Sequence, residues 1–407
     1  KKSKFPQLFI LNDKESANYF INDLENLINH EIFFYPASYR RSYQIEDTDI
    51  SNVLLRAEVL NKLNNKRNSI IISYPEAISE KVISRRVLNK KTITLSILDK
   101  YHPNLLEKIL TENNFTQSDF VTEPGQFSIR GGIIDVFSYA DEHPFRIEFF
   151  DDEIESIRMF NINTQLSVAK KEKISIIPNT DAKQTSEKQV SFLEYLPKST
   201  TIWLEDSQYV LGIIKQNFEK AQEEFKKSSN KSAIYQISPH EIFSNGDEFT
   251  NQLEKFKSVN FSSNNIFESD FEIQSNIIPL TPINKKFDIL FNELIKFQKN
   301  GYQNIIICSS EEQKERFHQI LENEEREINI TKIVGNLHKG FIDHDNKIAI
   351  YTDHQIFNRH HRFRSKTKFA DKQAITLKQL TNLKLGDFVT HIDHGIGEFA
   401  GLHKIDN

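Results

Sequence analysis

The chain has 407 residues, with 52 Lys and Arg against 57 Asp and Glu, so its formal net charge is −5. This balance excludes a uniformly basic nucleic-acid-binding protein, and any DNA contact would have to come from a local patch. The single cysteine, Cys308, excludes a disulfide framework and indicates a reducing cytosol. No apolar run is long enough to span a membrane, and no signal-peptide pattern opens the chain. We therefore expect a cytoplasmic protein with no membrane partner. Because the chain starts with Lys1, we expect it to be part of a longer protein.

Glycine placement bears on enzyme function. A lysine-bearing phosphate-binding loop needs Gly directly before Lys, and none of the 12 glycines is followed by Lys. We therefore predict no catalytic residues and no bound cofactor in this chain. A metal site is not predicted either, because His391, Asp393 and His394 do not share one strand face and lack a fourth ligand.

Residues 1–92 alternate between strand and helix patterns. Strands are predicted at 9–11, 31–35 and 69–73, with a helix over 15–29 and a second helix that has Ser51 as its N-cap. This alternation predicts a parallel sheet.

In residues 93–178 a helix is predicted near 104–113. After it, apolar residues recur with a period of two. Strands are predicted at 127–130, 133–137, 145–150 and 155–160. Turns are predicted at Gly131-Gly132 and at Asp151-Asp152. The pattern indicates an antiparallel β unit with one helix.

Residues 179–275 and 276–355 return to mixed α/β patterns. In the first stretch a strand is predicted at 200–204 and a helix over 207–227. In the second, the predicted elements are a helix over 287–299 that ends near Gly301, a buried parallel strand at 305–308, a helix capped by Ser309 or Ser310, and a strand at 347–351.

Residues 356–383 are basic and 384–407 read as strand, turn, strand. The basic stretch contains Arg359, Arg362, Arg364, Lys366 and Lys368. Such a run could contact DNA or RNA polymerase with salt-sensitive affinity. A solvated linker is the alternative, and we favour it.

The strand at 145–150 suggests a binding surface. A period of two places Arg146, Glu148 and Phe150 on one face, and Ile147 and Phe149 on the other. The aliphatic face is expected to pack on the core. An exposed aromatic beside an arginine is typical of a binding anchor, unless another domain covers Phe150.

Two long motifs carry a family resemblance. The stretches TEPGQFSIRGGIIDVF (122–137) and PFRIEFFDDEIESIR (144–158) resemble the interaction domain shared by the excision-repair protein UvrB and the bacterial transcription-repair coupling factors. Upstream, residues 33–49 and 69–77 resemble the flanking domain of the same proteins. Residues 386–402, GDFVTHIDHGIGEFAGL, are similar to the start of the RNA-polymerase-interacting domain of coupling factors and CarD-type regulators, a segment that UvrB lacks.

The resemblance implies an α/β multidomain fold. A UvrB-like α/β domain in two parts (1–92 and 179–275) would be interrupted by a UvrA-binding α+β domain (93–178). A small α/β domain (276–355), the basic linker (356–383) and the first strands of a CarD-like β-barrel (384–407) would follow.

The resemblance also implies partners and contact residues. The family's UvrA contacts are two arginines and a phenylalanine, which fall on Arg130, Arg146 and Phe150. RNA polymerase would be bound, through its β subunit, by the domain that begins near Gly386. A motor outside this chain would use ATP and Mg²⁺ to translocate on double-stranded DNA, and the protein would be a monomer. Two alternatives remain open: a UvrB-type helicase subunit, and a CarD-type transcription regulator without a motor.

Overall fold

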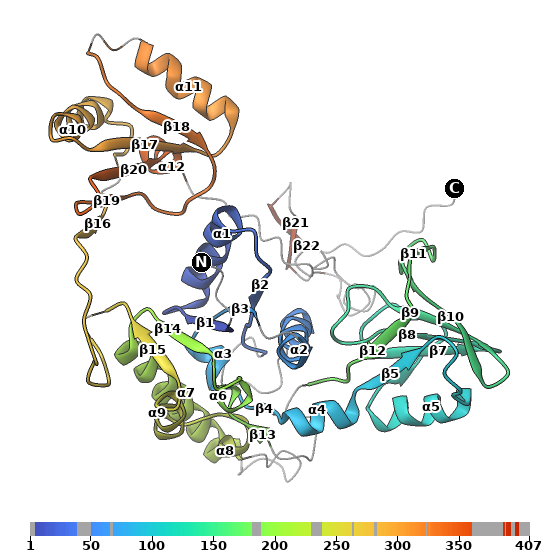
Figure 1. Cartoon of the computed structure of the whole chain (residues 1–407). Coiled ribbons are helices and arrows are strands. Elements are labelled where there is room, and N and C mark those ends of the chain that lie inside the picture. Colours follow the sequence, from blue (N-terminus) through green and yellow to red (C-terminus); the bar gives the residue numbers. More distant parts are fainter. Residues whose placement is uncertain are drawn as a thin grey trace. The chain divides into compact units, whose positions relative to one another are not determined.

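The computed structural model describes residues 5–38, 50–65, 68–180, 189–228, 238–262, 264–280, 283–322, 324, 326–359, 386, 388–391 and 395–398. The chain divides into two compact units, residues 1–365 and 366–407. The first unit contains three larger sheets with their helices, and the second contributes one strand pair (Figure 1).

The first sheet is parallel and draws its strands from two distant stretches of the chain. Its spatial order is β15-β14-β1-β3-β2, and every neighbouring pair is parallel. The strands are β1 (Gln7–Ile10), β2 (Ile32–Phe34), β3 (Ile70–Ser73), β14 (Thr201–Leu204) and β15 (Lys257–Asn260). Residues between β3 and β14 include the whole second sheet, so the chain leaves the first sheet and later returns to it.

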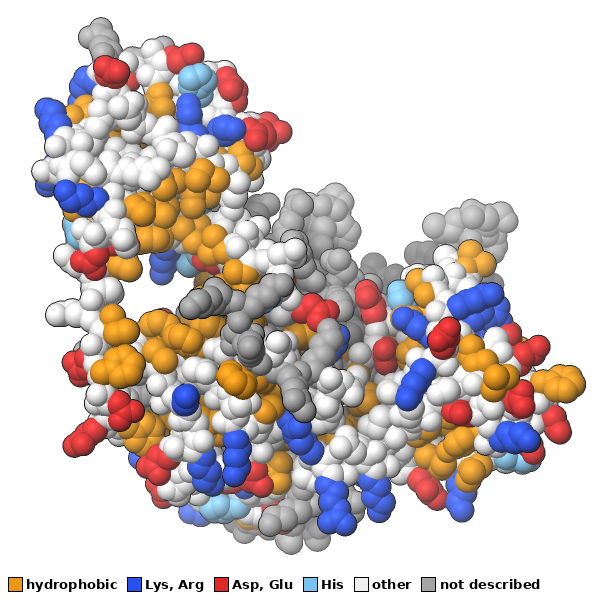
Figure 2. All heavy atoms as spheres, in the orientation of Figure 1, with side chains coloured by type: hydrophobic (Ala, Val, Ile, Leu, Met, Phe, Trp, Pro, Cys, Tyr) orange, Lys and Arg blue, Asp and Glu red, His pale blue; other side chains and the backbone are white. Residues whose placement is uncertain are grey.

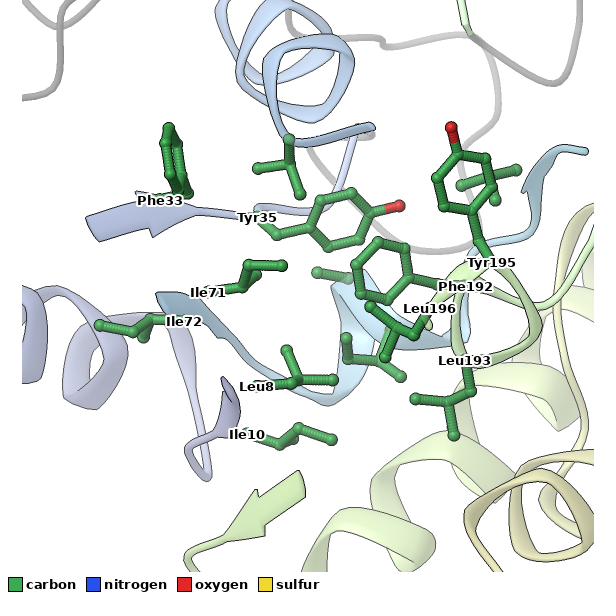
Figure 3. Close-up of a cluster of buried hydrophobic side chains, with 14 of the residues drawn as sticks. Leu8, Ile10, Phe33, Tyr35, Ile71, Ile72, Phe192, Leu193, Tyr195 and Leu196 are labelled. Atoms are coloured by element: carbon green, nitrogen blue, oxygen red, sulfur yellow. The ribbon is translucent and has the colours of Figure 1, made fainter. Parts of the chain in front are cut away.

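Helices bury both faces of this sheet, as a parallel sheet requires. They are α1 (Lys14–Leu27), α2 (Ile50–Asn65), α3 (Pro75–Ser79), α4 (Arg85–Lys91), α6 (Phe192–Tyr195), α7 (Ser207–Ser228), α8 (Pro239–Ile242) and α9 (Gly246–Leu253). Phe9 of β1 packs on Phe20 of α1 on one face, with ring centroids 5.1 Å apart. Leu8 and Ile10 point the other way, toward Leu193 (Figure 3). A small pair, β4 (Val82–Ile83) with β13 (Gln189–Val190), lies beside these helices.

The strands and helices predicted in this region are confirmed, with shifts of one or two residues at their ends. One detail is wrong: α2 already includes Ile50, so Ser51 lies inside the helix and is not its N-cap. Helix ends commonly differ by one or two residues from the boundary that local signals indicate. Residues 39–43, which contain basic and aromatic side chains, lie outside the described residues.

The second sheet is antiparallel apart from one edge. Its order is β11-β10-β9-β8-β7-β6. The strands are β6 (Thr116–Gln117), β7 (Gln126–Arg130), β8 (Ile133–Val136), β9 (Phe145–Phe150), β10 (Glu153–Phe160) and β11 (Ser167–Lys170). The predicted antiparallel unit is confirmed, except that the short β6 pairs in parallel with β7.

One face of the second sheet carries its hydrophobic core. Helix α5 (Pro103–Glu112) and a separate strand pair, β5 (Ile93–Ser96) with β12 (Lys173–Ile176), cover this face (Figure 1). Leu106 and Leu110 of α5 pack against Ile147 of β9 in a single buried cluster. The opposite face is polar, as the period of two predicts.

The third sheet is mixed, with the order β16-β19-β20-β17-β18. The strands are β16 (Ile277–Pro279), β17 (Gln303–Cys308), β18 (Thr331–Val334), β19 (Phe341–Asp343) and β20 (Ile348–Thr352), and the helices are α10 (Phe287–Lys299), α11 (Glu311–Glu322) and α12 (Asp353–Phe357). The buried strand β17 pairs in parallel with β18 and β20, as predicted. Ser310 caps α11 by accepting a hydrogen bond from the Gln313 amide, at 3.3 Å.

In the second unit the two predicted strands form an antiparallel pair, β21 (Phe388–His391) and β22 (Gly395–Glu398). The rest of the expected barrel segment and most of the basic stretch lie outside the described residues. On the face of the molecule in Figure 2, basic and acidic side chains are interspersed, which fits the near balance of charges. Among the described residues, no helix has the length and apolar character needed to cross a membrane.

A buried ion pair joins several elements of the first sheet's domain. The Arg56 guanidinium on α2 lies 3.1 Å from the Glu80 carboxylate, and both side chains are almost fully buried. Glu80 also accepts hydrogen bonds from the backbone amide and the hydroxyl of Ser38, just after β2. Arg56 donates to the carbonyl oxygen of Pro36 and stacks over the Tyr35 ring. This pair therefore fixes the chain beyond β2 against α2.

We expect Glu80→Gln to destabilise this domain strongly, because it leaves the Arg56 charge buried without its carboxylate. Removing one partner of such a pair costs about 3–5 kcal/mol. Urea unfolding can be followed through Trp203, the only tryptophan in the sequence, which lies on β14 of the same sheet. The exposed Arg86→Gln on α4 is the control and should change stability by less than about 0.5 kcal/mol. An unchanged midpoint for Glu80→Gln would contradict this account of the pair.

Candidate functional site

The candidate site lies on the polar face of the second sheet. Along β9 the side chains alternate: Phe145, Ile147 and Phe149 are buried, and Arg146 and Glu148 are half-buried. Phe150, at the end of the strand, is 76% exposed. The predicted two faces of this strand are therefore confirmed.

Two glycines bring Arg130 onto the same face. β7 and β8 are joined by the turn Gly131-Gly132, and Gly131 has a φ of +60°, a conformation that favours glycine. A Cβ on Gly132 would meet the Phe149 carbonyl oxygen at 3.0 Å, so the second glycine allows the turn to approach β9 closely. The resulting register pairs Arg130 with Ile133 and Ile133 with Glu148. Arg130 is thus two strands away from Glu148 on one face.

A single buried carboxylate lies between the two arginines. Asp135 on β8 is directly opposite Arg146 on β9, and its side chain is 1% exposed. Arg146 donates from Nε to Asp135 Oδ1 at 2.7 Å and from Nη2 to Oδ2 at 2.8 Å. Arg130 donates to the same Oδ2 from its Nη2. The hydrogen bond to Asp135 raises the pKa of Arg146 above its usual value. The shared carboxylate thus holds both guanidinium groups in place.

Each guanidinium is also supported by an aromatic ring. The Arg146 guanidinium carbon lies 4.4 Å from the centre of the Phe160 ring, and Arg146 Nη2 donates to Gln165 Oε1 at 3.1 Å. The Arg130 guanidinium carbon lies 5.5 Å from the centre of the Phe120 ring, which is itself 64% exposed. Such contacts fix a cation without neutralising it. Arg130 is about twice as exposed as Arg146, with side-chain exposures of 38% and 20%.

The charges on this face are mostly paired, with one positive charge in excess. Glu148 accepts hydrogen bonds from Arg158 Nη2 and from the Ser156 hydroxyl, so its charge is matched within the sheet. The net positive charge of the face comes from two arginines that share the single carboxylate of Asp135. Phe150 lies two pleats along β9 from Arg146, with about 13 Å between their Cα atoms. The arrangement suits a partner with carboxylates near an apolar contact.

The structure thus brings all three predicted contact residues, Arg130, Arg146 and Phe150, to one face. Sequence reasoning missed Asp135 and Phe120. The signal for Asp135 was available, because a charged residue in the otherwise apolar run IIDVF calls for a charged partner. No comparable signal marks Phe120, which lies in the irregular segment before β7.

Of the five basic residues predicted as possible DNA or polymerase contacts, only Arg359 is described. It donates to Gln313 Oε1 at 2.7 Å and lies over the Phe357 ring, so it packs on the third sheet's domain. Arg362, Arg364, Lys366 and Lys368 lie outside the described residues. Cys308 is fully buried at the end of β17, and burial raises the pKa of its thiol to about 11, which agrees with an inert core cysteine.

The sequence is similar to known proteins, both in the domain that contains this site and over the rest of the chain. Residues 93–181 match the UvrB interaction domain. Almost the whole chain, 98% of it, aligns at 22% identity with a transcription-repair coupling factor of Bacillus subtilis. Coupling factors of Rickettsia prowazekii and Staphylococcus aureus align over 97% and 98% of the chain, at 26% and 23% identity.

Over almost its whole length the chain is similar to transcription-repair coupling factors. The resemblance read from its motifs is therefore confirmed. The chain spans about 40% of the length of these curated relatives, so activities of the whole protein are not assigned by the match.

Adjacent phenylalanines on β9 offer a matched test of the two faces. Phe149→Ala should destabilise the interaction domain by about 3–5 kcal/mol, because it empties a core position that is 9% exposed. Phe150→Ala should change stability by less than about 0.5 kcal/mol. Hydrogen exchange of the β7–β10 amides reads this domain separately from the others. Equal loss of protection in both variants would mean that Phe150 is a core residue.

Proposed function

We propose that this chain recruits the damage-recognition ATPase UvrA through Arg130, Arg146 and Phe150. The observation that carries the proposal is their shared open face, on which one buried carboxylate holds both arginines. The match of residues 93–181 to the UvrB interaction domain supports it. The exposed Phe150 ring would be the apolar anchor, and the guanidinium groups would receive carboxylates of the partner.

We further propose that the whole protein couples stalled RNA polymerase to nucleotide-excision repair. The names of the curated relatives support this role. In this proposal RNA polymerase binds, through its β subunit, to the domain that begins near Gly386. A motor outside the chain uses ATP and Mg²⁺ to translocate on double-stranded DNA. The protein would act in the cytoplasm as a monomer.

Calorimetric titration with UvrA of the same organism tests the recruitment face. Arg146→Glu inverts a charge beside Asp135 and should weaken binding by about 2–5 kcal/mol. Phe150→Ala should also weaken binding, while its thermal melt stays that of the wild type.

The matched control is Lys108→Glu, the same charge inversion on α5, which packs on the opposite face of the sheet. The Lys108 side chain is 71% exposed. It should bind UvrA as the wild type does. Equal affinity for all four proteins would overturn the proposed face.

The same proposal assigns ATP hydrolysis to a motor outside the chain, since no glycine here is followed by lysine. A steady-state ATPase assay of the 407-residue chain, with and without double-stranded DNA, should give background turnover. Turnover above background that a point substitution within the chain abolishes would contradict this assignment.

A further inference from the structure

We propose that Asp135 is a positioning residue for UvrA recognition: it does not touch the partner, but it sets the orientation of Arg130 and Arg146. The inference rests on the proposed recruitment function and adds to it a residue that would not be in the contact surface. Asp135 is the point where the two arginines meet, on the strand between theirs.

The exposed fractions of the side chains distinguish the role of Asp135 from that of the arginines. The Asp135 side chain is 1% exposed and cannot reach a partner, whereas the Arg130 side chain is 38% exposed. Each arginine uses some of its N–H donors for hydrogen bonds within the domain and has another donor left for a partner. Arg146 uses Nε and Nη2, and its Nη1 donates to none of the described residues. Arg130 uses Nη1 and Nη2, and its Nε donates to none of them.

A purely structural role fits this arrangement poorly. A buried carboxylate with two guanidinium groups is costly to desolvate, and apolar side chains of similar volume usually stabilise a fold as well or better. The sheet already has a complete core on its other face, built on Ile147 and the α5 leucines. What the ion cluster supplies is two cations held at defined angles on an open surface. When long side chains are already ordered before binding, association loses less conformational entropy.

A purely electrostatic role and a positioning role of Asp135 predict opposite changes in UvrA affinity for the variant Asp135→Asn, which makes the proposal testable. Asp135→Asn removes a negative charge from the face and raises its positive potential. If the face attracted UvrA only by its charge, the variant would bind an acidic partner more tightly. If Asp135 positions the arginines, the variant binds more weakly, by about 10-fold or more, the usual effect of losing hydrogen bonds to a charged group.

The experiment is a titration of UvrA against the 407-residue chain, with a double-mutant cycle. Asp135→Asn should weaken binding in the wild type but by less than about 2-fold when Arg130 and Arg146 are both alanine, because its effect passes through them. Glu148→Gln is the control: it removes the same charge from the same face, but its carboxylate pairs with Arg158. It should not reproduce the loss.

Arg146→Lys keeps the proposal falsifiable even where Asp135→Asn disturbs the fold. Lysine keeps the positive charge and can still neutralise Asp135, but it lacks the planar fork that makes two bonds to one carboxylate. We expect Arg146→Lys to bind UvrA nearly as weakly as Arg146→Ala, with a melting temperature close to that of the wild type.

The outcomes separate this inference from the recruitment proposal. Loss of binding in Arg146→Glu, with wild-type affinity in Arg146→Lys and Asp135→Asn, would leave recruitment standing and overturn the positioning role. An equal loss from Asp135→Asn in the presence and absence of both arginines would also overturn it. A wild-type chain that does not bind UvrA would overturn both proposals.

Discussion

A carboxylate buried in a β-sheet has to be matched by positive charge, and Asp135 shows how far that constraint reaches. Asp135 lies opposite Arg146 on β9 and opposite Ser128 on β7, two residues along that strand from Arg130. This register places three charges on one side of three adjacent strands. The register in turn needs the tight Gly131-Gly132 turn, which a side chain at Gly132 would push away from β9. The long RGGIID motif is therefore one physical unit: the turn aligns the strands, and the alignment pairs the charges.

One face of this sheet forms the hydrophobic core of the domain, and the other carries the charged cluster and Phe150. Ile147 and its neighbours pack on α5 and on the β5–β12 pair, which makes the domain a folded body on its own core. Because the main core is on that side, the second face can hold charges and an exposed ring, with Phe160 buried beneath Arg146. The same strand, β9, supplies both faces, and a shift of one residue in its pairing would exchange Phe149 with Phe150. The stability of the domain and the exposure of Arg146 and Phe150 thus depend on one register.

Local patterns predicted the elements well and their partners less well. The period of two along RIEFF was enough to place Arg146 and Phe150 together, and β9 has the predicted bounds. Short strands such as β6, β13 and β15 were missed. Their residues are mostly polar, so they lack the apolar run that marks the equally short β1, β2 and β3. The bond from Arg130 to Asp135 could not be read from spacing, because it needs the register across two hairpins. Arg130 was predicted as a contact residue only from the family resemblance. The strand register explains why it lies on the same face as Arg146.

The exposure of Phe150 is the remaining step in the argument. A phenylalanine that is 76% exposed contributes little to the fold, while Phe149 beside it is almost fully buried. Asp151 follows with a φ of +57°, so the strand ends in a tight turn directly after Phe150. The ring therefore stands at a rigid corner and not on a loose loop, and Phe120 offers a second exposed ring beneath Arg130. Two exposed aromatic rings with a fixed pair of cations provide apolar area and charge together, which a partner that carries only one of the two would not match. On the proposed recruitment face, this combination would favour a partner that offers both carboxylates and an apolar contact.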